Sequence, residues 1–153
     1  MKTIAAFGEI MLRLSPPRGE RLLQSSRLSA VFGGGEANVA VSLARFGHNV
    51  RYITALPDND LGDAAVAELK KHGLQTDYIK RQGNRLGIYF AEPGADQRPS
   101  KVIYDRENSS IATAKPGNFD WTKILNGVEW FHTTGITPAL SQNAADLVLE
   151  AVQ

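Results

Sequence analysis

Gly33-Gly34-Gly35-Glu36-Ala37-Asn38 stands between an extended segment and a helical one, and the fold can be worked out from it. Three glycines let a ligand approach bare backbone, and the first turn of a helix offers unpaired N–H donors. The Asn38 amide can both donate to and accept from a hydroxyl group. The stretch therefore predicts either a tight strand-to-helix turn or a ligand contact. It is not a phosphate-binding loop, since no Gly-Lys-Ser/Thr follows, and it lacks the Gly-x-Gly-x-x-Gly spacing of dinucleotide sites.

Strand and helix patterns alternate on both sides of this stretch. A buried first strand is expected over 3–8, and residues 11–32 read as two extended segments around the turn Pro16-Pro17-Arg18-Gly19. Further strands are expected over 50–56, 78–79, 86–91, 102–106 and 130–134. Helices are expected over 36–46 and 61–72, ended by Gly47 and Gly73. A last helix is expected to begin near Thr137-Pro138, with Thr137 as its N-cap and Pro138 as its first residue. The alternation predicts an α/β fold.

The three helical segments differ in pattern. Segment 36–46 is apolar on nearly all sides, so we expect it to be largely buried. Segment 61–72 is capped by a carboxylate or the amide of Asp58-Asn59-Asp60. The last segment has one apolar face but reaches Gln153 without a stop signal or a following strand to cover it. We therefore expect this sequence to be cut in the middle of a fold.

Composition excludes several classes of protein. The 153 residues carry a net charge of +1, which gives no strong field for nucleic acid or for an anionic membrane. The absence of cysteine excludes disulfides, thiolate zinc sites and a cysteine nucleophile. The N-terminus has no signal-peptide core, and no apolar run approaches the roughly 18 residues of a membrane span. We expect a cytoplasmic protein in which residues 1–153 form part of one domain.

Three side chains in the later strands suggest a binding surface. Tyr104 and Arg106 alternate on one strand and therefore share a face, while Tyr89 points away from its neighbours Ile88 and Phe90. Two phenols and a guanidinium facing one cleft would suit a hydroxylated carboxylate, which an arginine can bind with two parallel hydrogen bonds. The alternative is a solvated arginine on an edge strand.

Several motifs together resemble the ribokinase-like sugar kinases, the family that includes the B-type phosphofructokinases. They are Gly8-Glu9, the run 33–40, Gly47 and Pro57-Asp58-Asn59-Asp60-Leu61-Gly62. Within this family, the segments 86–89, 102–106 and 135–140 look most like those of the 2-keto-3-deoxygluconate kinases. Two residues depart from the general family pattern: Glu36 replaces a small residue, as is common in this subgroup, and Pro57 stands where many members have glycine.

The resemblance implies a three-layer fold, a parallel central sheet flanked by helices, with a small β-lid over the sugar formed by segments of about 11–32 and 86–106. It also implies a small sugar-acid substrate. Lid strands packed on only one face leave open edges and uncovered apolar residues, so we expect a homodimer through the lid in the intact enzyme. These apolar residues include Ile88, Phe90, Val102 and Ile103. The substrate contacts that the resemblance implies are Gly34, Gly35, Asn38, Tyr89, Tyr104 and Arg106. Arg106 would hold the carboxylate, and Asn38 would bind a sugar hydroxyl.

The same resemblance implies that ATP and Mg²⁺ serve the intact enzyme and that neither is bound by this chain alone. The family's catalytic aspartate lies in a Gly-Ala-Gly-Asp-like stretch near the C-terminus, where an anion hole also forms. No such stretch occurs here. We therefore expect the N-terminal, substrate-binding half of a kinase, without a nucleotide site or catalytic residue and inactive in isolation.

Three alternatives remain open from the sequence. A fructokinase or ribokinase is the closest, although an apolar or acidic residue at position 106 would have favoured it. A non-catalytic sugar-acid-binding module differs in needing no second half. A dinucleotide-binding domain is disfavoured by the glycine spacing.

Overall fold

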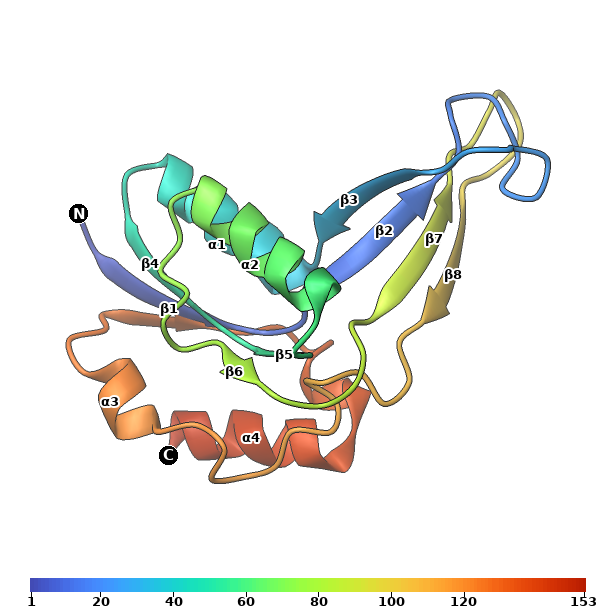
Figure 1. The fold of residues 1–153 in the computed structure, drawn as a ribbon. Helices are drawn as coiled ribbons and strands as arrows, with labels where there is room; N and C mark the ends of the chain where they lie inside the picture. The colour runs from blue at the N-terminus through green and yellow to red at the C-terminus, as the bar shows by residue number, and fades with distance from the viewer.

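The computed structural model describes residues 1–153 and shows an α/β body from which a separate β-sheet projects (Figure 1). The body is built on β1 (Thr3–Phe7), which pairs in parallel with β4 (Asn49–Ile53) and β9 (Trp130–His132). The strand order is β4-β1-β9. The helices α1 (Gly35–Arg45) and α2 (Asp60–Lys71) cover one face of this sheet. The helices α3 (Trp121–Leu125) and α4 (Gln142–Val152) cover the other, so the predicted three-layer arrangement is confirmed (Figure 1).

The alternation of side chains along β1 divides the core in two. Ile4 and Ala6 belong to a buried cluster with residues of α1 and α2, whereas Ala5 and Phe7 belong to a second cluster with residues of α3 and α4. Successive side chains of a strand point to opposite faces, so one central strand serves both layers. All four side chains are at most 5% exposed, which confirms the expectation of a buried first strand.

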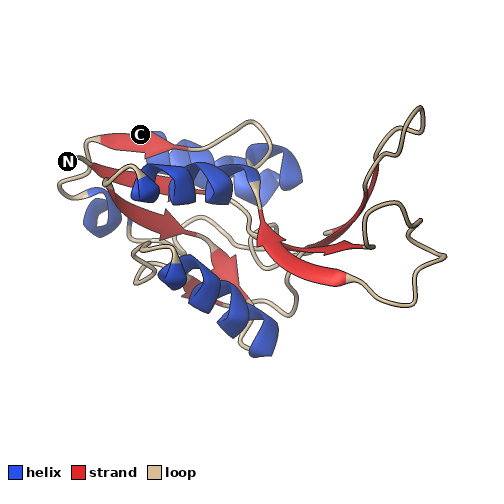
Figure 2. Ribbon diagram, turned by 90° about the horizontal axis from the view of Figure 1, so that it is seen from above, coloured by secondary structure: helices blue, strands red, loops and turns tan.

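The second sheet contains four strands in the order β3-β2-β7-β8. They are β2 (Met11–Ser15), β3 (Ser29–Gly33), β7 (Ile88–Glu92) and β8 (Lys101–Asp105). Strands β2 and β7 are parallel, and the two outer pairs are antiparallel. These strands lie within the segments 11–32 and 86–106 except for Gly33, and Figure 2 shows the sheet extending away from the helices.

Local signals at the ends of α1 and α2 act as the sequence predicts. Gly47 and Gly73 follow the two helices with φ values of 86° and 84°, a conformation that glycine adopts at little cost. Of the three candidate caps of α2, the amide oxygen of Asn59 accepts the hydrogen bond, from the backbone N–H of Gly62 at 3.1 Å.

Other expectations for the helices are wrong. Helix α1 is not largely buried: Phe46, just after it, is 79% exposed, because only one side of the helix packs on the body. The last helix does not begin at Thr137-Pro138, where Pro138–Leu140 forms a single 3₁₀ turn. It begins at Gln142, and the Ser141 hydroxyl caps it by accepting from the N–H of Ala144 at 3.0 Å.

The remaining strands also differ from the expected ranges. The segment 50–56 is divided at Thr54 into β4 and β5 (Ala55–Leu56). The strand expected over 78–79 lies instead at β6 (Lys80–Arg81), which pairs with β5. The short helix α3 was not expected from the sequence. None of the helices has both the length and the apolar character needed to cross a membrane.

Candidate functional site

A pocket of about 160 Å³ lies where the four-stranded sheet meets the body. All six residues that the sequence predicts as contacts line it: Gly34, Gly35, Asn38, Tyr89, Tyr104 and Arg106. Four residues that were not predicted complete the lining: Glu9, Met11, Glu36 and Ile136. The structure thus gathers into one site residues that come from five separate parts of the chain.

The glycine stretch brings its backbone against the segment that follows β1. A Cβ atom on Gly34 would lie 2.1 Å from the carbonyl oxygen of Glu9, which is a steric clash between two non-bonded atoms. Gly34 therefore allows the start of α1 to pack directly beside Glu9. On Gly35 a Cβ would meet nothing closer than 3.8 Å, so only the first of these two positions requires glycine for packing.

The two tyrosines lie side by side on the four-stranded sheet, and Arg106, directly after the end of β8, lies beside Tyr104 as the predicted alternation requires. Tyr89 and Tyr104 are directly opposite each other on β7 and β8, with ring centroids 5.9 Å apart. The guanidinium of Arg106 lies 5.4 Å from the centroid of the Tyr104 ring. A cation at that distance is attracted to the face of an aromatic ring, so Tyr104 helps to fix the orientation of Arg106.

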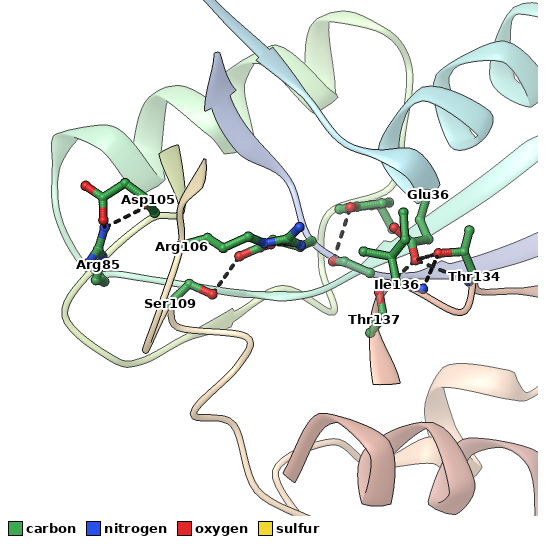
Figure 3. Close-up of polar contacts among 11 residues, drawn as sticks. Glu36, Arg85, Asp105, Arg106, Ser109, Thr134, Ile136 and Thr137 are labelled. Atoms are coloured by element: carbon green, nitrogen blue, oxygen red, sulfur yellow. Dashed lines mark hydrogen bonds and ion pairs between the residues drawn. The ribbon is translucent and has the colours of Figure 1, made fainter. Parts of the chain in front are cut away.

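Arg106 already has a carboxylate partner within the chain. Its Nη2 atom forms an ion pair with Oε2 of Glu9, and the hydroxyl of Ser109 donates to Oε1 of Glu9 at 2.6 Å (Figure 3). Glu9 is only 3% exposed. Burial raises the pKa of Glu9, although the Ser109 and Arg106 contacts act in the opposite direction. The sequence analysis names Glu9 only within the family motif Gly8-Glu9 and does not predict it as a site residue. The signal that marks it is a carboxylate directly after the expected strand 3–8.

Glu36 ties the start of α1 to the loop that follows β9. Its Oε1 atom accepts from the backbone N–H of Thr134 at 3.2 Å and from the hydroxyls of Thr134 and Thr137, each at 2.7 Å (Figure 3). Glu36 is 2% exposed, so these donors replace the water that its carboxylate loses. The hydroxyl of Thr137 is therefore used here and not as the helix cap that the sequence suggests. The contacts also hold Ile136 at the edge of the pocket.

A buried phenol lies behind the two carboxylates. Tyr52 is fully buried, and its hydroxyl donates to the carbonyl oxygen of Gly8 at 3.2 Å. Burial raises the pKa of Tyr52 well above its ordinary value, and the nearby Glu36 and Glu9 raise it further. The phenol therefore stays neutral and acts as a hydrogen-bond donor that holds the end of β1.

A hollow of about 430 Å³ adjoins the pocket and shares Arg106 and Ile136 with it. Two further hollows that are larger than the pocket lie elsewhere on the molecule. One of about 590 Å³ lies at the far end of the four-stranded sheet, and one of about 300 Å³ lies between α1 and α2. The first contains none of the predicted contacts and the second contains only Asn38. Volume alone does not locate the site, which is marked by its convergent polar groups.

Known proteins share this arrangement over the whole chain. The 2-dehydro-3-deoxygalactonokinase of Haloferax volcanii is 38% identical over 151 residues, which are 98% of this chain and 47% of that protein. The crystal structure of the 2-dehydro-3-deoxygluconokinase of Thermotoga maritima has a TM-score of 0.97 at 52% identity, over 99% of this chain and 47% of that one. A PfkB family carbohydrate kinase from Listeria grayi has a TM-score of 0.96 at 37% identity, with the same coverage.

The chain spans about half the length of the curated relatives it matches. The sequence pattern described as pfkB family carbohydrate kinase matches residues 1–153 without interruption. With the three-layer body, the projecting sheet and the pocket between them, this match shows that the chain belongs to the pfkB family of carbohydrate kinases.

Proposed function

We propose that this chain is the substrate-binding part of an ATP-dependent sugar kinase that phosphorylates a hydroxyl of 2-keto-3-deoxygluconate or a similar keto-acid sugar. The observation that carries the proposal is the convergence of Tyr89, Tyr104 and Arg106 with the Gly34 backbone on one small pocket. Relatives named for the phosphorylation of 2-dehydro-3-deoxy sugar acids support the same substrate class.

Each lining group has a role that its chemistry allows. The Arg106 guanidinium carries five N–H donors in a fixed plane, which suits a carboxylate. The two phenols and the Asn38 amide can bind hydroxyl groups, and the backbone at Gly34 can approach the sugar without a side chain in between. In this proposal the four-stranded sheet is the lid, since it carries both tyrosines and lies against the body only at its base.

Exchange of Arg106 for alanine tests the substrate class. We expect Arg106→Ala to weaken 2-keto-3-deoxygluconate by roughly ten- to a hundredfold and to leave a neutral ketose nearly unaffected, because only the acid offers a carboxylate. We expect Arg106→Ala to raise KM and to leave kcat nearly unchanged, since Arg106 would bind the carboxylate equally in the ground and transition states. Steady-state kinetics of the complete kinase, as wild type and as Arg106→Ala, on both sugars measure it.

Arg85→Ala is the matched control. Arg85 forms an ion pair with Asp105 at 2.7 Å beside the same strand but does not line the pocket. It should lower the binding of both sugars little and equally. Equal losses for acid and neutral sugar in Arg106→Ala would mean that Arg106 is a structural residue of the lid and that its assignment to the carboxylate is wrong.

ATP and Mg²⁺ belong to the proposal for the whole kinase. No group of three or more His, Asp or Glu side chains that could hold a metal ion occurs in the chain. The two pocket carboxylates are occupied by Arg106, Ser109 and the threonines. We therefore place no phosphoryl-transfer step on these residues, and we expect the 153-residue chain alone to release no ADP in a coupled assay with sugar. Because it would use ATP, we propose that the whole kinase acts in the cytoplasm.

We also propose a homodimer formed through the lid. Strands β3 and β8 are unpaired along their outer edges, and the side chains of Val31, Val102 and Ile103 are 44%, 47% and 42% exposed. Apolar side chains beside open strand edges favour association with a second sheet. Analytical ultracentrifugation at micromolar concentration tests this, with Val102→Lys as the variant expected to shift the protein to monomer. A wild-type protein that sediments only as a monomer would contradict the proposal.

A further inference from the structure

The charges that line the pocket do not match those of the ligand it is proposed to hold. Two carboxylates, Glu9 and Glu36, and one guanidinium, Arg106, line it. Arg106 is already paired with Glu9. A sugar acid would bring a third carboxylate to a site with a single cation, and like charges repel strongly where burial excludes water.

The two carboxylates differ in the hydrogen-bond donors and cations that the chain supplies to stabilise their negative charge. Glu36 accepts three hydrogen bonds at one oxygen, from Thr134 and Thr137. None of these donors is Arg106, so Glu36 keeps all three if Arg106 turns to a ligand. Glu9 accepts one hydrogen bond from Ser109 and depends otherwise on Arg106. If Arg106 turned to a ligand, Glu9 would remain a carboxylate with one neutral donor at a position that is 3% exposed.

The groups around Glu9 leave it no other cation. They are Arg106 and Ser109 from the segment after β8, Glu36 from α1 and Tyr52 from β4, with Tyr89 and Tyr104 across the pocket. Only Arg106 among them is positive, and Tyr52 stays neutral. Burial already raises the pKa of Glu9, which is the direction that proton uptake requires.

We propose that Glu9 is a specificity-determining residue that couples the binding of a sugar acid to the uptake of one proton. Arg106 exchanges the Glu9 carboxylate for the ligand's carboxylate, and Glu9 takes a proton from the solvent and becomes a neutral acid. No covalent bond changes. A neutral sugar leaves the Glu9–Arg106 pair intact and binds without proton uptake. This inference rests on the substrate class proposed above.

Isothermal titration calorimetry tests the coupling directly. The protein is titrated with 2-keto-3-deoxygluconate at pH 7 to 8 in phosphate and in Tris, whose ionisation enthalpies differ. We expect the enthalpy difference to correspond to about one proton taken up per ligand, and the affinity to fall about tenfold per pH unit. Glu9→Gln should abolish both effects. Glu107→Gln, which removes an exposed carboxylate next to Arg106 in the chain, should keep both effects.

The possible outcomes separate the two proposals. Binding of the acid without proton uptake in the wild type, or with the same uptake in Glu9→Gln, would overturn the role of Glu9 and leave the substrate class standing. No binding of the acid by the wild type would overturn the proposed function itself, and this inference with it.

A second measurement covers the case in which Glu9→Gln does not fold. The ¹³C chemical shift of the Glu9 carboxyl group is followed in wild-type protein at pH 7.5, with and without the sugar acid. We expect ligand to move it to the position of a protonated acid. A shift that stays at the carboxylate position with ligand bound would overturn the proposal.

Discussion

Along β1 every side chain from Ile4 to Phe7 is buried, whereas along β8 all five residues are exposed. The α/β body thus gains its stability from apolar burial in two clusters. The four-stranded sheet is held mainly by its strand pairing, since only Met11 and Gly33 of its residues are buried. The pocket lies where these two regions meet, so the well-buried body and the exposed sheet both supply residues to it.

The largest expected effect is the difference in stability lost when a side chain is truncated in the body and when one is truncated in the sheet. Leu69 on α2 is 1% exposed in the core cluster, so Leu69→Ala should lower the free energy of unfolding by about 2–5 kcal/mol. Val102→Ala on β8 should cost no more than about 1 kcal/mol, because Val102 is 47% exposed. Urea denaturation measures both. Equal losses would mean that the sheet contributes to the core as the body does.

A smaller effect is expected at the junction of the two regions. Gly34→Ala forces a Cβ to within 2.1 Å of the Glu9 carbonyl oxygen, so we expect a loss of about 1–3 kcal/mol in the free energy of unfolding. The neighbouring Gly35→Ala meets no atom closer than 3.8 Å and lies in the first turn of α1. It should be neutral or stabilise slightly. Thermal unfolding of both variants tests whether stability is lost because of the close approach between Gly34 and Glu9 or because a glycine is replaced.

Within the body, one helix cap tests how far local sequence signals contribute. Asn59→Ala removes the acceptor for the Gly62 N–H and should cost about 1 kcal/mol. Asp58→Ala is the control, because its side chain is 89% exposed and pairs with Arg81 only at 3.8 Å. It should change stability by less than about 0.5 kcal/mol. The reverse order in denaturation experiments would assign the cap to Asp58.

The smallest expected effect is a difference in pH dependence between two glutamates, one at the junction and one on the body. The pKa of Glu9 lies above its ordinary value of 4.5 in the folded state, so the folded state binds the proton more tightly. Stability from this group therefore falls as pH rises from about 4.5 through the raised pKa. Glu9→Gln should remove that decline.

Glu68 on α2 is expected to show the opposite sign. Its slight burial acts to raise its pKa, but the contacts with His72 and Lys71 outweigh this and lower it. Its contribution is present above the ordinary value of 4.5 and is lost as pH falls through the lowered pKa. Urea denaturation of wild type, Glu9→Gln and Glu68→Gln between pH 3 and 8 separates the two windows. A wild-type decline above pH 4.5 that persists in Glu9→Gln would assign it to another group.

Much of the fold follows from local signals that the sequence carries. The apolar first strand, the glycines that end α1 and α2, and the alternation that places Tyr104 and Arg106 on one face each depend on residues a few positions apart. Such signals act through backbone conformation and side-chain direction, so they hold wherever the segment lies. The six contacts that the family resemblance implies also line one pocket, but local signals do not bring them together, since they come from segments far apart in the sequence.

Only the tertiary structure decided the contacts that join distant segments. Glu9 meets Ser109 across 100 positions, and Glu36 meets Thr137 across 101. Local pattern favoured Thr137 as a helix cap, but burial of the Glu36 carboxylate required donors, and the Thr137 hydroxyl supplies one of them. Likewise Arg106 was expected to be free for a ligand and is paired with Glu9. A buried charge must find a partner wherever packing brings one close, and no short stretch of sequence contains that information.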